Sequence, residues 1–213
     1  MKLNTILIGG MSMALVACLS VGATLAYLHA TTQEVTNTFV GSDGIQISLD
    51  EAPVRRNNGT GGYIATTGDR VKSNHYTEII SNVENYKDPT VHLEKVPDGG
   101  VKVYAFITGV DTDPATDKYT AAVNVDPKWR RVYPSGTGVD GVYVYTNGST
   151  TAAQKVSGTE SLEPIFTSVT FTYNQVGNVK PTFENIEIKA FAIQAAADDT
   201  TALASAKEAF GVL

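Results

Sequence analysis

Several short runs of the chain alternate apolar and polar residues with a period of two, and this pattern restricts the fold more than any other feature. Residues 45–49 and 91–96 each place every second side chain on one face, as a strand with one face on a core requires. Residues 101–107 start in the same way and then become apolar at every position, which predicts a central strand. The pattern is strongest over residues 186–194. Further strands are predicted at residues 121–125, 129–133, 139–146 and 165–173.

Turn-forming residues separate these runs, for example Asn147-Gly148. Because no segments of helical period alternate regularly with the strands, the sequence predicts an all-β fold, an antiparallel jelly roll or β-sandwich. One short C-terminal helix is expected after residues 198–201, which supply N-cap candidates. Its apolar stripe would consist of Leu203, Ala206 and Phe210, and Gly211 would end it. Residues 55–62 are predicted to form a mobile loop.

The first part of the chain has the features of an export signal. After Lys2 the next charged residue is Glu34, and the stretch between them is largely apolar or small. A small residue at Ala26 fits a signal peptidase cut before Tyr27. Residues 1–26 are therefore predicted to be a signal peptide, and the protein is predicted to be secreted.

Two alternatives for this leader stay open. The residues Leu15-Val16-Ala17-Cys18 resemble a lipobox, in which Cys18 would be lipidated and become the N-terminus. The apolar run is also long enough for a retained transmembrane anchor, which needs about 20 residues. We favour the cleaved signal, because the apolar run continues past Cys18 to Leu28, where a lipoprotein normally turns polar. Export is predicted under each alternative.

Composition excludes several classes of function. The chain has one cysteine, so it has no disulfide framework, and removal of the leader would leave no thiol nucleophile. With a net charge of −6 and 18% charged residues, it lacks the basic surface that nucleic-acid binding requires. It contains no Gly-x-Ser-x-Gly elbow and no phosphate-binding glycine loop. We therefore predict no catalytic residue and no cofactor.

Three groups of residues are of a type that could bind a metal. His75 with Glu78 lacks the His-Glu-x-x-His spacing of a zinc site. His92 and Glu94 share one face of a predicted strand, where a solvated edge explains them better. The acidic residues Asp111, Asp113 and Asp117 lack the EF-hand glycine and glutamate and are predicted to form a turn. No metal site is predicted.

Five stretches resemble the TasA/CalY (camelysin) family of Gram-positive biofilm-matrix proteins, which the SipW signal peptidase processes. The resemblance is most specific near the N-terminus and continues in the C-terminal half. The stretches are residues 22–28, 34–41, 45–51, 162–166 and 188–195.

The resemblance implies a secreted jelly-roll subunit of extracellular fibres, with the N-terminal strand of each subunit completing the sheet of the next. Residues 27–40 would then be the donor segment and residues 41–213 the jelly-roll domain. The sequence itself supports this role, because the first residues of the donor segment favour a strand and include no proline or glycine. The expected donor strand comprises Tyr27, Leu28, His29, Ala30, Thr31, Thr32, Gln33, Glu34 and Val35.

The expected partners are other copies of the chain, a signal peptidase of the SipW type and an accessory protein for anchoring or assembly. A head-to-tail contact of this kind does not have to close, so it predicts a filament. Two alternatives stay open: a camelysin-like cell-surface metalloprotease, and a lipid-anchored minor subunit or adhesin held by Cys18.

Overall fold

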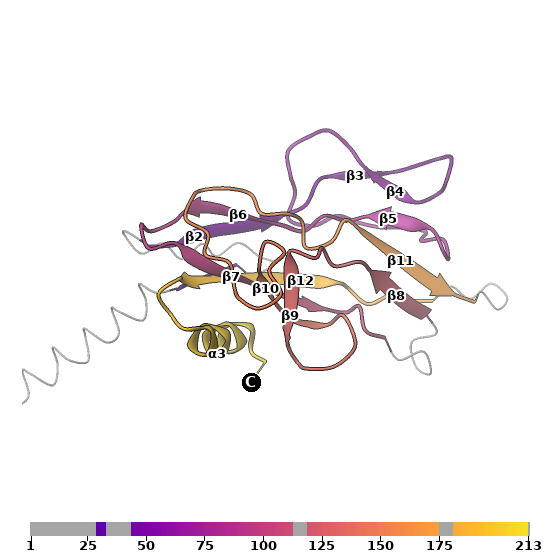
Figure 1. Ribbon diagram of the computed structural model, residues 1–213. Coiled ribbons are helices and arrows are strands. Elements are labelled where there is room, and N and C mark those ends of the chain that lie inside the picture. The colour runs from indigo at the N-terminus through magenta and orange to yellow at the C-terminus, as the bar shows by residue number, and fades with distance from the viewer. Residues whose placement is uncertain (1–28, 33–43, 113–118, 175–180, 213) are drawn as a thin grey trace, which may run out of the picture.

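The computed structural model describes residues 29–32, 44–112, 119–174 and 181–212. Antiparallel strands in two layers dominate the regular structure of this part of the chain, and a helix covers one outer face (Figure 1). The predicted fold class, an all-β antiparallel jelly-roll or β-sandwich with a short C-terminal helix, is confirmed. The elements are β1 (His29–Thr32), β2 (Gln46–Asp50), β3 (Val54–Arg56), β4 (Tyr63–Ala65), β5 (Glu84–Tyr86), β6 (Thr90–Lys95), β7 (Val101–Thr108), β8 (Tyr119–Val123), β9 (Trp129–Tyr133), β10 (Gly141–Tyr145), β11 (Ser168–Tyr173), β12 (Glu187–Gln194) and α3 (Asp199–Phe210).

The first layer is a five-stranded sheet with the order β1-β12-β7-β10-β9. Strand β7 lies in its middle and pairs with β12 along its whole length. Side chains on both faces of β7 are buried, Val103 toward the second layer and Tyr104 toward the helix. The prediction of a central strand at residues 101–107 is therefore confirmed. The two edges of this sheet are β1 and β9.

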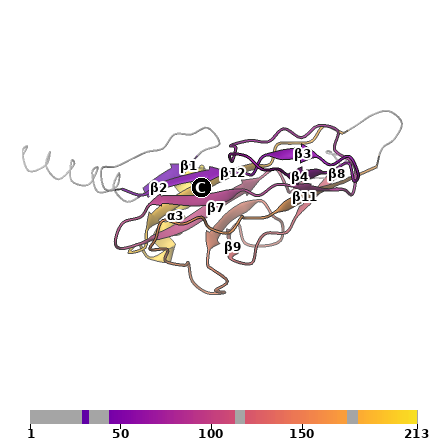
Figure 2. The ribbon, with the colours of Figure 1, turned by 90° about the horizontal axis from the view of Figure 1, so that it is seen from above.

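The second layer consists of the pair β2-β6 and the three-stranded sheet β5-β11-β8, with the hairpin β3-β4 beside them (Figure 1). The main core lies between the layers and contains Ile47 of β2, Leu93 of β6, and Val103 and Ile188 of the first layer. Burial of these side chains is the dominant favourable contribution to folding. Viewed from above, β1 and β2 lie close together at one end of the molecule (Figure 2).

The predicted loop over residues 55–62 is in fact part of a hairpin. Arg55 and Arg56 belong to β3, which pairs with β4, and only the residues between the two strands form the connection. A hydrogen bond from the Gly61 N–H to the Asn57 carbonyl closes this turn. Composition was misleading here, because the glycines and asparagines mark the tip of the hairpin and the strands beside it have three residues each.

Helix α3 packs on the outer face of the five-stranded sheet. Its buried residues are Ala202, Ala206 and Phe210, which contact a second core cluster that includes Tyr104 and Phe191. The predicted stripe is thus correct at Ala206 and Phe210, while Leu203 is only half-buried at its margin. The helix ends at Gly211, which adopts the left-handed conformation with φ 73°.

The N-terminus of α3 gives a testable prediction about pH. The Asp198 side chain accepts hydrogen bonds from the backbone N–H and hydroxyl of Thr201 and from the backbone N–H of Thr200, and these bonds lower the pKa of Asp198 below its usual value. A lowered carboxylate pKa stabilises the fold above the pKa of the unfolded chain and is lost as the pH falls through the pKa of the folded protein. We expect Asp198→Ala to reduce the melting temperature at pH 7, as removal of an N-cap does. In strongly acidic solution, below the pKa of Asp198, the melting temperatures of the variant and the wild type should lie closer together.

Thermal unfolding followed by far-UV circular dichroism at both pH values measures this effect. Asp69→Ala is the control, because Asp69 is exposed and lies outside the helix. An Asp198→Ala difference that stays the same at both pH values would contradict the proposed cap contribution.

Candidate functional site at the edge of the five-stranded sheet

Part of the predicted donor strand lies at one edge of the five-stranded sheet. Residues His29–Thr32 form β1, which is antiparallel to β12, with Ala30 opposite Ala192 and Thr31 opposite Phe191. In this chain the strand therefore pairs with the sheet of its own molecule. Which molecule supplies the strand in an assembly stays a prediction. The other predicted residues, Cys18, Ala26, Tyr27, Leu28, Gln33, Glu34 and Val35, lie outside the described residues.

Strand β12, which receives β1, is apolar on both faces. Ile188, Ala190 and Ala192 point into the core between the layers, whereas Phe191 and Ile193 face the helix. A long apolar strand with no neighbour on one side would be a template for pairing with other chains. Strand β1 covers this side of β12 in part, because it pairs with four of the eight residues of β12. In this structure β1 therefore covers half of the side of β12 that would otherwise be an unpaired edge.

His92 was predicted to lie on a solvated edge, and this is wrong. Its imidazole is half-buried between two partners, because Nε2 lies 2.7 Å from Asp50 Oδ1 and Nδ1 lies 2.6 Å from Ser161 Oγ. Both ring nitrogens are therefore occupied. Glu94 on the same strand is exposed, as predicted.

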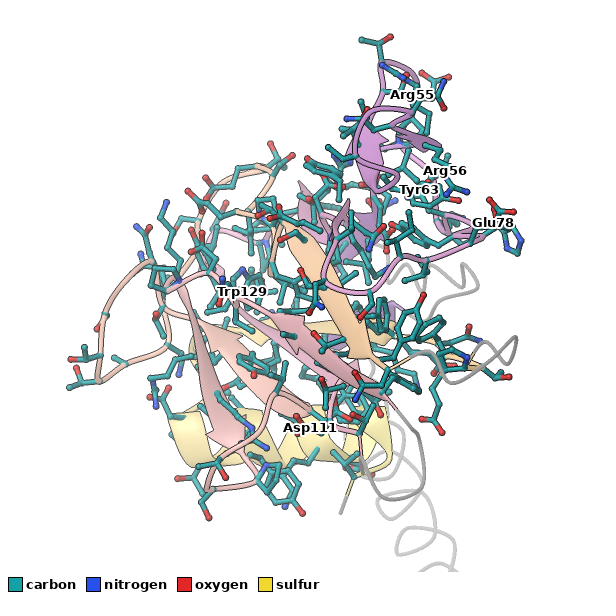
Figure 3. The ribbon with its side chains drawn as sticks, turned by 90° about the vertical axis from the view of Figure 1, so that its right-hand side faces the viewer. Arg55, Arg56, Tyr63, Glu78, Asp111 and Trp129 are labelled. Atoms are coloured by element: carbon teal, nitrogen blue, oxygen red, sulfur yellow. The ribbon has the colours of Figure 1, made fainter. Side chains whose placement is uncertain are left out.

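His75 and Glu78 do not form a common site. Glu78 pairs with Arg56 of the hairpin, at the tip of the molecule shown in Figure 3, and His75 is exposed in the preceding loop. Among the described residues, no three His, Cys, Asp or Glu side chains gather closely enough to hold a metal ion.

Asp111 has a structural role in the turn that follows β7, as predicted. Its carboxylate accepts hydrogen bonds from the backbone N–H groups of Val139 and Asp140, and the Asp140 carboxylate accepts in return from Gly109, Val110 and Asp111. Two loops are thus tied by reciprocal bonds. Gly109 is required there, because its φ is 86° and a Cβ would lie 2.1 Å from the Asn185 carbonyl oxygen. Asp113 and Asp117 lie outside the described residues.

A network of charges around Arg70 was not predicted. The Arg70 guanidinium donates to Asp50, to Asp88 Oδ2 at 2.9 Å and to Thr90 Oγ1 at 2.8 Å. Asp88 is buried and also accepts from the Ala52 N–H. This network ties the ends of β2 and β6 to the loop that contains Arg70.

Next to this network lies a second unpredicted cluster, which we call the buried triad: the buried Glu51 and Lys87 with the half-buried Asn74. Glu51 and Lys87 form an ion pair, and Asn74 donates from Nδ2 to the other carboxylate oxygen of Glu51 at 3.1 Å. Tyr76 lies nearby, and its burial, together with the negative charges of Glu51 and Asp88, raises its pKa far above the usual value. All three triad residues line an open cavity of about 600 Å³, whose other walls include Leu49, Phe171 and Ile188.

The sequence offered no signal for either cluster. Glu51 and Lys87 are 36 residues apart, and neither stands in a motif that separates it from an ordinary surface residue. Only the pairing of the strands brings them together.

Comparison with known proteins gives no further guide to identity. No family model, curated protein or solved structure matches this chain. In the part of the chain that the structure describes, no helix is long and apolar enough to cross a membrane.

Proposed function

We propose that this protein is a secreted structural subunit of extracellular biofilm-matrix fibres, which assembles head to tail by donor-strand complementation. The observation that supports the proposal best is the pairing of β1 with β12. The segment expected to be the donor occupies the edge of the sheet that an added strand would complete. In the proposed fibre, β1 of one subunit takes this place on the next subunit.

Moving β1 from its own subunit to the next one requires few new contacts. Antiparallel pairing supplies main-chain hydrogen bonds that do not depend on which molecule provides the strand. Exchange of an identical element between copies is an inexpensive route to assembly, and a head-to-tail contact continues indefinitely when its rotation does not close. Residues 33–43, which connect β1 to the domain, span up to about 36 Å when fully extended.

In this proposal the chain is exported and residues 1–26 are removed. The cut between Ala26 and Tyr27 would free the donor segment. A leader that is still attached would hold this segment at the membrane. The sheet of the next subunit would therefore receive a donor strand only after processing.

Deletion of residues 27–35 from the mature chain tests the proposal. We expect the variant to fold, because the core residues that the structure describes all lie after residue 44, and to form no filaments by electron microscopy. Filaments of normal length from this variant would contradict donor-strand assembly.

A cysteine pair identifies the molecule that supplies the strand. Ala30 and Ala192 lie opposite each other in the β1–β12 register, and the mature chain has no cysteine of its own. Opposite residues of neighbouring strands lie within the range that a disulfide spans. In Ala30→Cys/Ala192→Cys filaments we expect a ladder of covalent multimers on a non-reducing gel, while the two single-cysteine variants give no such ladder. A covalently closed monomer alone would show that each strand stays in its own subunit.

A further inference from the structure

The buried triad brings an amine, an amide and a carboxylate together at the wall of the cavity. Glu51 directly follows β2, Lys87 directly follows β5, and Asn74 lies in the loop before β5. Glu51 is 6% exposed and Lys87 is 9% exposed. The two oxygens of the Glu51 carboxylate bind Lys87 Nζ and Asn74 Nδ2 separately, so one carboxylate bridges the amine and the amide.

This arrangement is not explained by stability alone. A buried ion pair gains little over a well-packed apolar pair, because both charges lose their hydration. The pair also places a lysine amine directly against a carboxylate. A desolvated neutral lysine amine is a nucleophile, and an adjacent carboxylate is a suitable general base for it.

Asn74 is held as an electrophile. Its Nδ2 also donates to the Ala52 carbonyl at 2.9 Å, and its Oδ1 accepts from the Val54 backbone N–H at 3.1 Å. The amide is therefore fixed at both ends, and the carboxylate that binds it also binds the amine. The Val54 N–H points at the oxygen that becomes negatively charged when a nucleophile adds to the amide carbon, as in an oxyanion hole.

We propose that Lys87 and Asn74 form an intramolecular isopeptide bond, with Glu51 transferring the protons. Glu51 takes one proton from the Lys87 ammonium, and the free Nζ then attacks Cγ of Asn74. Glu51 passes this proton to Nδ2 and takes a second proton from Nζ. The bond between Cγ and Nδ2 breaks, ammonia leaves, and an amide joins Nζ to Cγ while Glu51 stays protonated. The reaction needs no oxidant and no further reactant.

Two features of the surroundings suit this reaction. Fixing the amine and the amide on one carboxylate makes the reaction effectively unimolecular, which lowers its entropic barrier. The cavity beside the triad is lined by all three residues and gives ammonia a way out. The new bond would close the loop from Asn74 to Lys87 in a chain that has no disulfide after loss of the leader.

A second lysine–glutamate pair provides the comparison. Lys128 binds Glu163, but both side chains are more than a third exposed, and the other oxygen of Glu163 accepts from the Tyr145 hydroxyl. The second oxygen of Glu163 thus binds a phenol hydroxyl where that of Glu51 binds an asparagine amide, so we expect no isopeptide bond at Lys128. Lysine and glutamate alone are therefore not sufficient for the bond.

Tryptic peptide mapping by mass spectrometry of the full chain tests the proposal. Trypsin cuts after Lys72, Lys87 and Lys95 in an unlinked chain, which yields peptides 73–87 and 88–95. The isopeptide bond blocks the cut after Lys87, so we expect one peptide, 73–95, lighter by one ammonia. Recovery of 73–87 and 88–95 at full mass from the native protein would overturn the proposal, and this result requires no variant to fold.

Two variants show whether Glu51 acts as proposed. In Glu51→Gln the carboxylate is lost at nearly constant shape, and we expect the cut after Lys87 and the full peptide masses to return. Lys128→Arg should leave the linked 73–95 peptide unchanged. The peptide map is preferable to the intact mass, because ring closure at Asn58-Gly59 or Asn147-Gly148 also releases ammonia. A lightened 73–95 peptide that persists in Glu51→Gln would contradict the role of Glu51.

Discussion

Replacing Phe191 by alanine is expected to lower the free energy of unfolding by about 3–5 kcal/mol, the usual cost of removing a buried phenylalanine. Phe191 is 1% exposed and lies on β12, on the face that the helix covers. Its ring lies 6.3 Å from that of Phe210 and 6.4 Å from that of Tyr104. Alanine would leave a cavity between the sheet and α3 that these neighbours can fill only in part.

Chemical denaturation, followed by circular dichroism and by the fluorescence of the single tryptophan, measures this loss. Trp129 belongs to the core between the layers, so its signal reports global unfolding rather than the local change beneath the helix. Phe106→Ala is the matched control, because Phe106 stacks on Phe210 at 5.6 Å from the same sheet but is only half-buried. We expect a clearly smaller loss for the control. Equal losses would contradict the central place of Phe191 in this cluster.

Arg70→Met is expected to cost about 3 kcal/mol, the lower end of the range for removing one partner of a buried ion pair. The lower end applies because the Arg70 side chain is 31% exposed, whereas the Asp88 residue is 3% exposed. The substitution leaves the Asp88 carboxylate buried without its cation. It also removes the donors to Thr90 and to the Asp88 carbonyl.

Arg70→Lys should recover only a small part of this loss. The guanidinium reaches Asp50 and Asp88 at once through separate nitrogens, which a single ammonium cannot reproduce. Arg55→Met is the control, because Arg55 is exposed on β3. Denaturation midpoints of the three variants are the measurement. A lysine variant as stable as the wild type would show that charge alone, without the forked geometry, holds the network.

Four of the five strands of the first layer, β7, β9, β10 and β12, could be predicted because each is long enough to show its pattern. The predicted runs at 101–107 and 186–194 correspond to β7 and β12, and 129–133 coincides with β9. Strands β3, β4 and β5 were missed because three residues are too few for a period of two to show. The predicted strand at 165–173 begins late, at Ser168, because Ile165 instead bonds through its N–H to the Pro89 carbonyl.

The site was less predictable than the fold. The donor segment was expected from a resemblance, and the pairing of His29–Thr32 with β12 agrees in position with that expectation. The buried triad and the Arg70 network could not be predicted, because their members come from separate strands and loops. A charged residue usually indicates an exposed position, and nothing local distinguishes Lys87 from the exposed Lys72.

The opposite edge of the five-stranded sheet bears on the symmetry of a fibre. Strand β9 carries Arg130 and Arg131 in succession and is followed by Pro134. Arg131 donates to the carbonyls of Gly136, Thr137 and Asp140, which draws the next loop back toward the strand. Charge and proline of this kind discourage further pairing at an edge. The two edges of this sheet therefore differ, because one pairs with a strand and the other discourages pairing. A fibre built by adding strands at the first edge would be polar, and its two ends would grow differently.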